Sequence, residues 1–311
     1  MGDTAAPTVC AVVVTHNRCD LLMECLRRLQ RQTRLPEEVL VVDNASTDQT
    51  AAMLAEHPGI EVLTLRTNVG AGGGFAHGMR RAYEQGYDWI WLLDDDTLAD
   101  EQCLETLLAG ARRAPKRPSL VASVVRWRDS SLHPMNFPWL RLDRRGEFAQ
   151  AAGAGLALIR TASFVSMMVT REAVVEHGLP PTHYFVWVDD MQWTGRLLRN
   201  GTGYMVPESI AWHWTERPYS TVTDSRERFY FKVRNQLWVL RGSSFGGLER
   251  VFYARAYLQS LLAYLRGSER KSQALRTVAR GLRDGLRSEP AHEVSPVHIG
   301  VTDENGDAVS R

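Results

Sequence analysis

Three adjacent carboxylates, Asp94, Asp95 and Asp96, follow a run of large apolar residues in the segment WIWLLDDDTL. Neighbouring negative charges repel one another, and each loses hydration when it is partly buried. A solvated acidic loop is one explanation, although such a loop gains nothing from following a buried strand. A divalent cation bound to a phosphate would offset the repulsion, and carboxylates with open water positions suit Mg²⁺ or Mn²⁺. Asp94 and Asp96, on either side of Asp95, are therefore candidate metal ligands.

A second acidic pair, Asp189 and Asp190, lies between Trp187 and Trp193. Carboxylates are favourable at a helix N-terminus, so helix capping alone is one explanation of the pair. Two aspartates flanked by aromatic rings also resemble a general base beside a stacking platform. His213 stands between two tryptophans at the end of a predicted strand. A single histidine is usually structural, but beside two acidic clusters it is also a candidate third metal ligand.

The first third of the chain alternates between strand and helix patterns. Short β-branched runs predict strands buried on both faces, and stripes of apolar residues predict helices between them. Strands are expected at residues 9–15, 39–42, 60–65 and 89–93, and helices at residues 20–32, 49–56 and 75–84. This order predicts a mostly parallel α/β sheet.

Polar residues follow each of these strands in turn. They are Thr15, His16, Asn17 and Arg18 after the first; Asp43 and Asn44 after the second; Asn68 after the third; and Asp94, Asp95 and Asp96 after the fourth. Ligands of such sheets bind outside the carboxyl ends of the strands. The four strand ends therefore predict one binding crevice.

A glycine-rich segment, RTNVGAGGGFAHG, follows the third predicted strand and is expected to be a turn. It does not fit the dinucleotide-binding pattern, because Phe75 stands where the third glycine belongs and because the run follows the third strand rather than the first. Two interpretations stay open: a flexible loop, or a backbone that must approach a ligand closely.

The rest of the chain is harder to assign. Residues 111–150 are expected to be mainly loops, residues 151–170 to hold a strand beside the site, and residues 204–214 to form another strand. Helices are expected at residues 171–177 and 189–199 and over most of residues 226–287, and the last twenty or so residues have the composition of a tail.

Residues 249–287 contain nine basic and three acidic residues, a net charge of +6, with apolar residues at near-helical spacing. They predict either helices packed on the catalytic domain or a basic amphipathic surface resting on anionic lipid.

Composition narrows the function class. The 311 residues carry a formal net charge of +1, with 44% hydrophobic and 23% charged residues, so nothing in the overall charge predicts binding to nucleic acid. None of the four cysteines forms a CxxC pair, so neither a zinc site nor a disulfide scaffold is expected. No stretch approaches the roughly 18 apolar residues of a spanning helix, and no signal segment opens the chain. We expect a cytoplasmic protein, with peripheral contact to the inner face of the plasma membrane left open.

An ordered set of motifs gives a family resemblance. The segments VVVTHNR, VVDNAS, NVGAGGGFAHGM, WLLDDDT, FVWVDDMQW, IAWHW and FKVRNQL cover about residues 8–240. Together they resemble the inverting family 2 glycosyltransferases of GT-A fold, and among these the bacterial galactofuranosyltransferases of the short, initiating type. The resemblance implies transfer of a sugar, with galactofuranose favoured, from a nucleoside-diphosphate sugar to a hydroxyl of a glycan or glycolipid, using Mn²⁺ or Mg²⁺.

The resemblance also implies roles for individual residues. The residues implied to bind the donor, with a UDP-sugar favoured, are Thr15, His16, Arg18, Asp43, Asn44, Asn68, Gly70, Asp94 and Asp95. The implied metal ligands are Asp94, Asp96 and His213, and the implied catalytic base is Asp190. The residues implied to line the acceptor side are Phe164, Trp187, Asp189 and Trp193.

Some features depart from the family pattern, and other functions stay open. Phe164 stands where such enzymes carry a tryptophan, and related rhamnosyltransferases, which use dTDP-rhamnose, share most of the motifs. A soluble small-molecule acceptor, a non-catalytic nucleotide-sugar binder and a nucleotidyltransferase are the alternatives, although the turn THNR lacks the basic glycine-rich pattern of the last. We expect a GT-A catalytic domain at 1–225 (donor half 8–110, acceptor half 111–225), a helical region at 226–290 and a flexible tail at 291–311.

Overall fold

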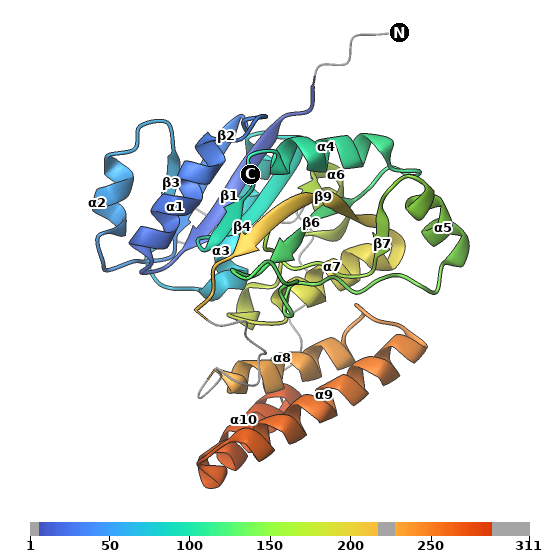
Figure 1. Cartoon of the computed structure of the whole chain (residues 1–311). Helices are drawn as coiled ribbons and strands as arrows, with labels where there is room; N and C mark the ends of the chain where they lie inside the picture. The colour runs from blue at the N-terminus through green and yellow to red at the C-terminus, as the bar shows by residue number, and fades with distance from the viewer. Residues whose placement is uncertain (1–5, 217–227, 288–311) are drawn as a thin grey trace, which may run out of the picture.

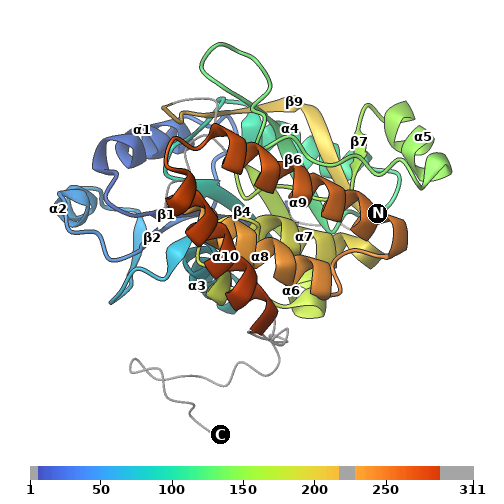
Figure 2. The ribbon, with the colours of Figure 1, turned by 90° about the horizontal axis from the view of Figure 1, so that it is seen from below.

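The computed structural model describes residues 6–216 and 228–287 and has an α/β architecture (Figure 1). A nine-stranded sheet forms the centre, with the order β3-β2-β1-β4-β8-β6-β9-β5 and with β7 paired to β9. Helices cover both faces of the sheet, and three further helices lie below it (Figures 1 and 2). The predicted fold class, an α/β sheet followed by C-terminal helices, is confirmed.

The first half of the sheet is fully parallel. Its strands are β1 (Val9–Thr15), β2 (Glu38–Asp43), β3 (Glu61–Thr64) and β4 (Trp89–Asp94). Alternate side chains of β1 enter two different cores: Val9, Ala11 and Val13 face one side, and Cys10, Val12 and Val14 the other. Both faces are therefore covered, as continuous β-branched runs predict.

The second half of the sheet is mixed. It contains β5 (Thr97–Ala99), β6 (Leu120–Arg126), β7 (Ala157–Ile159), β8 (Met167–Thr170) and β9 (Gly203–His213). Antiparallel pairs join β4 to β8, β8 to β6, β9 to β5 and β9 to β7, whereas β6 and β9 are parallel. The single strand expected within residues 151–170 is two short strands, preceded by the end of a helix, and β5 was not expected.

Two groups of helices enclose the sheet. One core contains side chains of α1 (Cys19–Gln30), α2 (Thr50–Ala55), α4 (Cys103–Arg113) and α5 (Arg145–Gly153). The opposite core contains side chains of α3 (Gly70–Glu84), α6 (Arg171–His177) and α7 (Asp189–Asn200). A short 3₁₀ helix, η1 (Thr182–Tyr184), precedes α7.

The glycine-rich segment corrects a prediction. Helix α3 begins at Gly70 rather than at residue 75, so Gly70, Gly72, Gly73 and Gly74, which were expected in a turn, belong to the helix. An added Cβ at Gly74 would lie 2.5 Å from a methyl carbon of Val14, and one at Gly78 would clash with Val12. These two glycines let α3 pack closely on β1, so they serve the approach of a helix to the sheet rather than a flexible loop.

The C-terminal region consists of α8 (Phe229–Arg241), α9 (Gly247–Gly267) and α10 (Lys271–Arg287), which pack on one another around their own apolar cluster. Figure 2 shows them together across the lower side of the molecule. Val278 is buried and Leu265 is half-buried, so only part of the predicted apolar stripe is exposed. No helix within residues 6–216 and 228–287 is long and apolar enough to cross a membrane.

The proposed domain limits are only partly covered by the described residues. The boundary at 225/226 falls within residues 217–227, and the expected tail at 291–311 falls within residues 288–311, both outside the described part. The division into a catalytic domain and a helical region stays a proposal.

Candidate active site

A cavity of about 620 Å³ lies at the carboxyl ends of the central strands. The ends of β1 and β4 line one part of it. The start of α3, residues 134–139 and 161–165, the loop before α7, the end of β9 and helix α8 line other parts. Polar groups from four strand ends were expected to share one crevice. Thr15, Asn44, Asn68 and Asp94, which lie at or just beyond the ends of those four strands, do line this one cavity.

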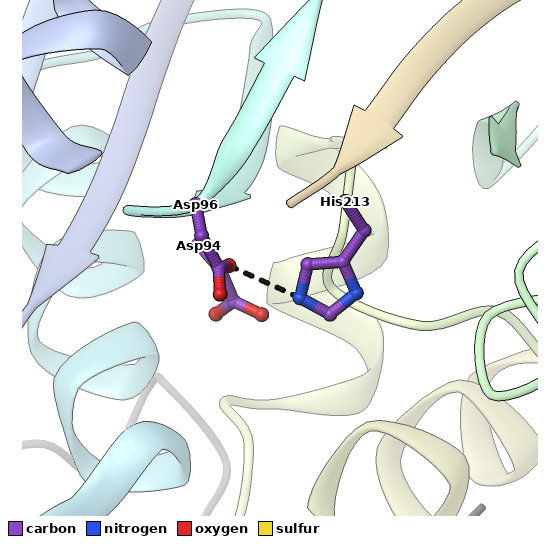
Figure 3. Close-up of side chains that lie close together, drawn as sticks. All are labelled: Asp94, Asp96 and His213. Atoms are coloured by element: carbon purple, nitrogen blue, oxygen red, sulfur yellow. Dashed lines mark ion pairs between the residues drawn. The ribbon is translucent and has the colours of Figure 1, made fainter. Parts of the chain in front are cut away.

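Asp94, Asp96 and His213 lie in the lining of this cavity, and Figure 3 shows their side chains close together. One potential ligand atom from each lies within 4.8 Å of the others, and His213 Nε2 is 3.0 Å from Asp96 Oδ1. The sheet creates this proximity: β5 pairs with β9 so that Thr97 lies opposite His213, and the Trp214 amide donates a hydrogen bond to the Asp96 carbonyl. Two carboxylates and an imidazole within one coordination sphere fit a divalent cation such as Mn²⁺.

The supporting contacts fix the orientation of these side chains. Asn136 Oδ1 lies 2.8 Å from His213 Nδ1, which leaves Nε2 directed at Asp96. A partner on one ring nitrogen is what orients a metal-binding histidine. Arg18 donates to Asp95 Oδ1 at 3.2 Å and to Asp96 Oδ2 at 2.6 Å, and the Thr15 hydroxyl donates to Asp95 Oδ2 at 2.9 Å.

The acidic groups differ in their pKa values because they differ in partners. Burial and the neighbouring charge of Asp96 raise the pKa of Asp94 to about 6, and burial raises that of Asp95 to about 7 despite the opposing effect of Arg18. Burial also acts on Asp96, but His213 and Arg18 hold its pKa below the usual range. Asp96 is thus the most acidic of the three. A dication would favour ionised Asp94 as well.

The second acidic pair faces the same cavity from the first turn of α7. Asp189 is 4% exposed and its Oδ2 lies against Gly72, whereas Asp190 is half-buried on the cavity wall. Burial raises the pKa of Asp190 to about 6 and raises that of Asp189 well above its ordinary value. Of the two, Asp190 is better placed to take a proton, because it is less enclosed and its pKa is lower.

Most of the predicted donor residues line the cavity. These are Thr15, His16, Arg18, Asn44, Asn68, Gly70, Asp94 and Asp95. Asn44 Oδ1 accepts from the Val69 amide, its Nδ2 donates to the Gly70 carbonyl, and Asn68 accepts from the Gly70 amide. The two asparagines therefore fix the start of α3. Asp43 does not line the cavity: it is 1% exposed and accepts from the Ser46 amide.

Of the four predicted acceptor residues, three line the cavity and one does not. Phe164, Trp187 and Asp189 line the cavity, although Phe164 is 4% exposed and its ring packs against Phe75 at a centroid distance of 4.7 Å. Trp193 lies in the core, fully buried, with its indole N–H donating to the Gly178 carbonyl. It supports the wall of the cavity from behind.

Comparison with known proteins identifies the family. A family model described as glycosyl transferase family 2 matches residues 10–173, more than half of the chain. The chain belongs to glycosyl transferase family 2.

A curated relative is similar in sequence, and solved structures are similar in fold. The chain is 35% identical over 204 residues to galactofuranosyltransferase GlfT1 of Mycobacterium tuberculosis, a match that covers 62% of this chain and 66%, just under two thirds, of that protein. Its fold is similar to that of S. aureus TarS 1-349 in complex with UDP-GlcNAc, with a TM-score of 0.62, 16% identity, and coverage of 90% of this chain and 80% of that one. It is also similar to GalNAc-T7 with UDP, GalNAc and Mn²⁺, with a TM-score of 0.54, 12% identity, and coverage of 82% and 55%.

Sequence reasoning missed part of the glycosyltransferase cavity. Residues 134–139 line it, as do Arg228, Lys232 and Gln236, which follow one another at four-residue intervals from the start of α8. The segment FKVRNQL holds two of these three and was noted only as a family motif. The spacing of four was a usable signal, because such residues share one helix face. Asp190, His213 and α8 all lie beyond the matched residues 10–173.

Proposed function

We propose that this chain transfers galactofuranose from UDP-galactofuranose to a hydroxyl group of a glycan or glycolipid, with inversion at the anomeric carbon. The main support is that one cavity holds both the Asp94–Asp96–His213 group and Asp190. The first suits the diphosphate side of a nucleotide-sugar reaction and the second suits the hydroxyl side.

The proposed mechanism assigns separate tasks to the two sides. His16 and Arg18 contact the donor diphosphate, while Asn44 and Asn68 keep the start of α3 in place beside the nucleotide. A divalent cation held by Asp94, Asp96 and His213 would neutralise charge on the departing nucleoside diphosphate, which removes the need for a general acid. Asp190 accepts the proton of the acceptor hydroxyl as its oxygen attacks the opposite face of the sugar. One base and no covalent sugar intermediate give a single displacement, hence inversion.

The choice of sugar rests on the relatives. The mycobacterial relative is named a galactofuranosyltransferase, and TarS was crystallised with UDP-GlcNAc, which supports a uridine donor. The runner-up donor is dTDP-rhamnose. The cation is Mn²⁺ or Mg²⁺, with the Mn²⁺ of the GalNAc-T7 structure favouring the former.

A donor panel tests the proposal. Purified protein is incubated with Mn²⁺, a lipid-linked glycan acceptor and, in turn, UDP-galactofuranose, UDP-galactopyranose, UDP-GlcNAc and dTDP-rhamnose, while nucleotide release and acceptor mass are followed. We expect turnover with UDP-galactofuranose, with the product anomer opposite to that of the donor. Turnover with dTDP-rhamnose alone would contradict the sugar assignment, and retention of configuration would contradict the mechanism.

We further propose that helix α9 rests on an anionic membrane surface. Tyr253, Tyr257, Leu261 and Tyr264 bury one face of this helix. The opposite face exposes Leu248, Val251, Phe252, Leu258 and Leu262. Arg255 and Arg266 are exposed on the same side, and α9 and α10 together carry a net charge of +6. Exposed apolar side chains among arginines are typical of helices that lie at the surface of anionic lipid, where a lipid-linked acceptor would be available.

A further inference from the structure

Asn235 of α8 makes an unusual set of hydrogen bonds to the loop in front of the proposed base. Its side-chain amide donates to three backbone carbonyls, those of Tyr184 at 3.0 Å, Val186 at 3.0 Å and Trp187 at 2.8 Å. Asn235 is fully buried, so no water replaces these bonds. A buried carbonyl that loses its donor is unfavourable, so this side chain helps to fix the positions of all three carbonyls.

The loop that Asn235 holds is strained. Phe185, Trp187 and Val188 have φ values of 66°, 64° and 72°, in the left-handed region that residues other than glycine rarely adopt. For the β-branched Val188 this conformation is especially unfavourable. Such backbone persists only where the surroundings impose it, and it is concentrated at functional sites. The next two residues along the chain are Asp189 and Asp190 at the start of α7.

Further contacts hold the same loop from two sides. Arg234 donates to the carbonyls of His183 at 2.9 Å and Tyr184 at 3.1 Å, and its guanidinium lies 4.2 Å from the centre of the Trp238 ring. On the other side Gly70 lies directly against the backbone of Phe185, where an added Cβ would clash. The loop is thus enclosed between α8 and α3. Because Asp190 follows this loop directly, both helices influence the orientation of its side chain.

We propose that Asn235 is a positioning residue for catalysis: it holds the strained 184–188 loop so that the Asp190 carboxylate faces the acceptor hydroxyl. This inference rests on the proposed role of Asp190 as base. It assigns a catalytic contribution to the C-terminal helical region, which supplies no group that touches the reacting atoms in the mechanism above. A base displaced by about 1 Å can lose on the order of a hundredfold in rate, so a relaxed loop is expected to slow turnover.

The test compares Asn235→Ala with wild type in the full-length protein, using UDP-galactofuranose, Mn²⁺ and the lipid-linked acceptor. We expect kcat to fall about tenfold or more, while the dissociation constant of UDP with Mn²⁺, from titration calorimetry, stays within about twofold. Arg241→Gln is the matched control. Arg241 also lies on α8 and donates to two backbone carbonyls, those of Gly285 and Leu286, but these belong to α10. The kcat of the Arg241→Gln variant is expected to equal that of wild type.

A double-mutant cycle separates positioning from general damage. In an Asp190→Asn background, Asn235→Ala is expected to change the residual rate by less than about twofold, because a residue that acts through the base has no further effect once the base is removed. An equal loss in both backgrounds, or a parallel loss of UDP binding, would overturn the inference. Full activity of a folded Asn235→Ala protein would do the same.

Two further results keep the conclusions separate. If Asn235→Ala does not fold, Arg234→Gln removes the neighbouring pair of hydrogen bonds from a half-buried position, and the same selective loss of kcat is expected. Unchanged kcat in that folded variant overturns the inference. If Asp190→Asn is as active as wild type, the assigned base is wrong, whereas an impaired Asp190→Asn beside a fully active Asn235→Ala refutes only the positioning role.

Discussion

The raised pKa of Asp190 predicts an acid limit to activity. Burial raises this pKa to about 6, with a further increase from the charge of Asp94, while the Met191 amide acts in the opposite direction. As the proposed base, Asp190 would function as the carboxylate, so about half of the protein would be inactive at a pH of about 6. Below that pH kcat/KM falls about tenfold per unit. Between pH 8 and pH 5 we therefore expect a loss of about tenfold, where an aspartate with an ordinary pKa near 4 would give almost none.

The assay is the initial rate of UDP release at low donor concentration between pH 5 and pH 8, with Mn²⁺ saturating at each pH. Saturation matters because His213 must lose its proton to bind a cation. Burial lowers the pKa of His213, but the charge of Asp96 outweighs this effect, so the pKa is raised. If the acid side of the pH–rate profile shifts with Mn²⁺ concentration, it therefore reports the titration of His213. If this acid limb does not shift, it reports the titration of the base. Asp190→Asn should lose about a hundredfold or more in kcat and the acid limb with it. A wild-type rate that is flat down to pH 5 would refute the burial argument, and an unchanged limb in Asp190→Asn would assign it to another group.

Three other results are expected. Asp96→Asn should abolish turnover and the Mn²⁺-dependent part of UDP binding, as should EDTA, and full activity in the presence of chelator would disprove the metal site. Gly70→Ala should lower both kcat and the melting temperature, because φ is +77° and the new methyl group meets Phe185, whereas Gly86→Ala, with φ of +91° and no neighbour within 4 Å, should cost only the backbone strain of about 1–2 kcal/mol. Phe252→Ser should weaken co-sedimentation with anionic vesicles at low salt while leaving donor hydrolysis intact, and a wild-type protein that ignores such vesicles would exclude the lipid surface.

Local sequence patterns were sufficient to predict the parallel half of the fold. The run at residues 9–15 is buried throughout, and the observed strand has the same limits. The polar residues after β1 and β4 were predictable as one site for the same reason, because parallel strands bring their carboxyl ends to one edge. Only the second part of helix α3, residues 75–84, was predicted, and its glycine-rich start at Gly70 was not. Glycine has a low helix propensity, and its use at Gly74 depends on contact with Val14, which local sequence does not reveal.

The acceptor side was predicted less well, because it depends on how distant elements dock. Trp193 was expected on the acceptor side of the cavity, and it does share a helix face with Asp190, three residues before it. Its large ring nevertheless extends into the core behind Phe164, where the indole N–H donates to the Gly178 carbonyl. Lys232 was not assigned a role, since its place in the cavity depends on the docking of α8 against the loop before α7. Packing between elements, rather than periodicity within them, decides such positions.

The pairing of β5 with β9 brings His213 to Asp94 and Asp96, so this group forms only when distant parts of the sheet have assembled. About 120 residues of chain separate Asp96 from His213, so joining them closes a long loop whose entropy cost must be met before the contact forms. Contacts of such high sequence separation form slowly in folding, and a chain synthesised only as far as α7 would hold the two aspartates without the imidazole. Cation affinity therefore reports the completed fold. A ligand that binds only this form, at a hundred times its dissociation constant, would stabilise it by about 2.7 kcal/mol. With the proposed function, the cation and the donor would therefore raise the stability of the folded protein as well as support its reaction.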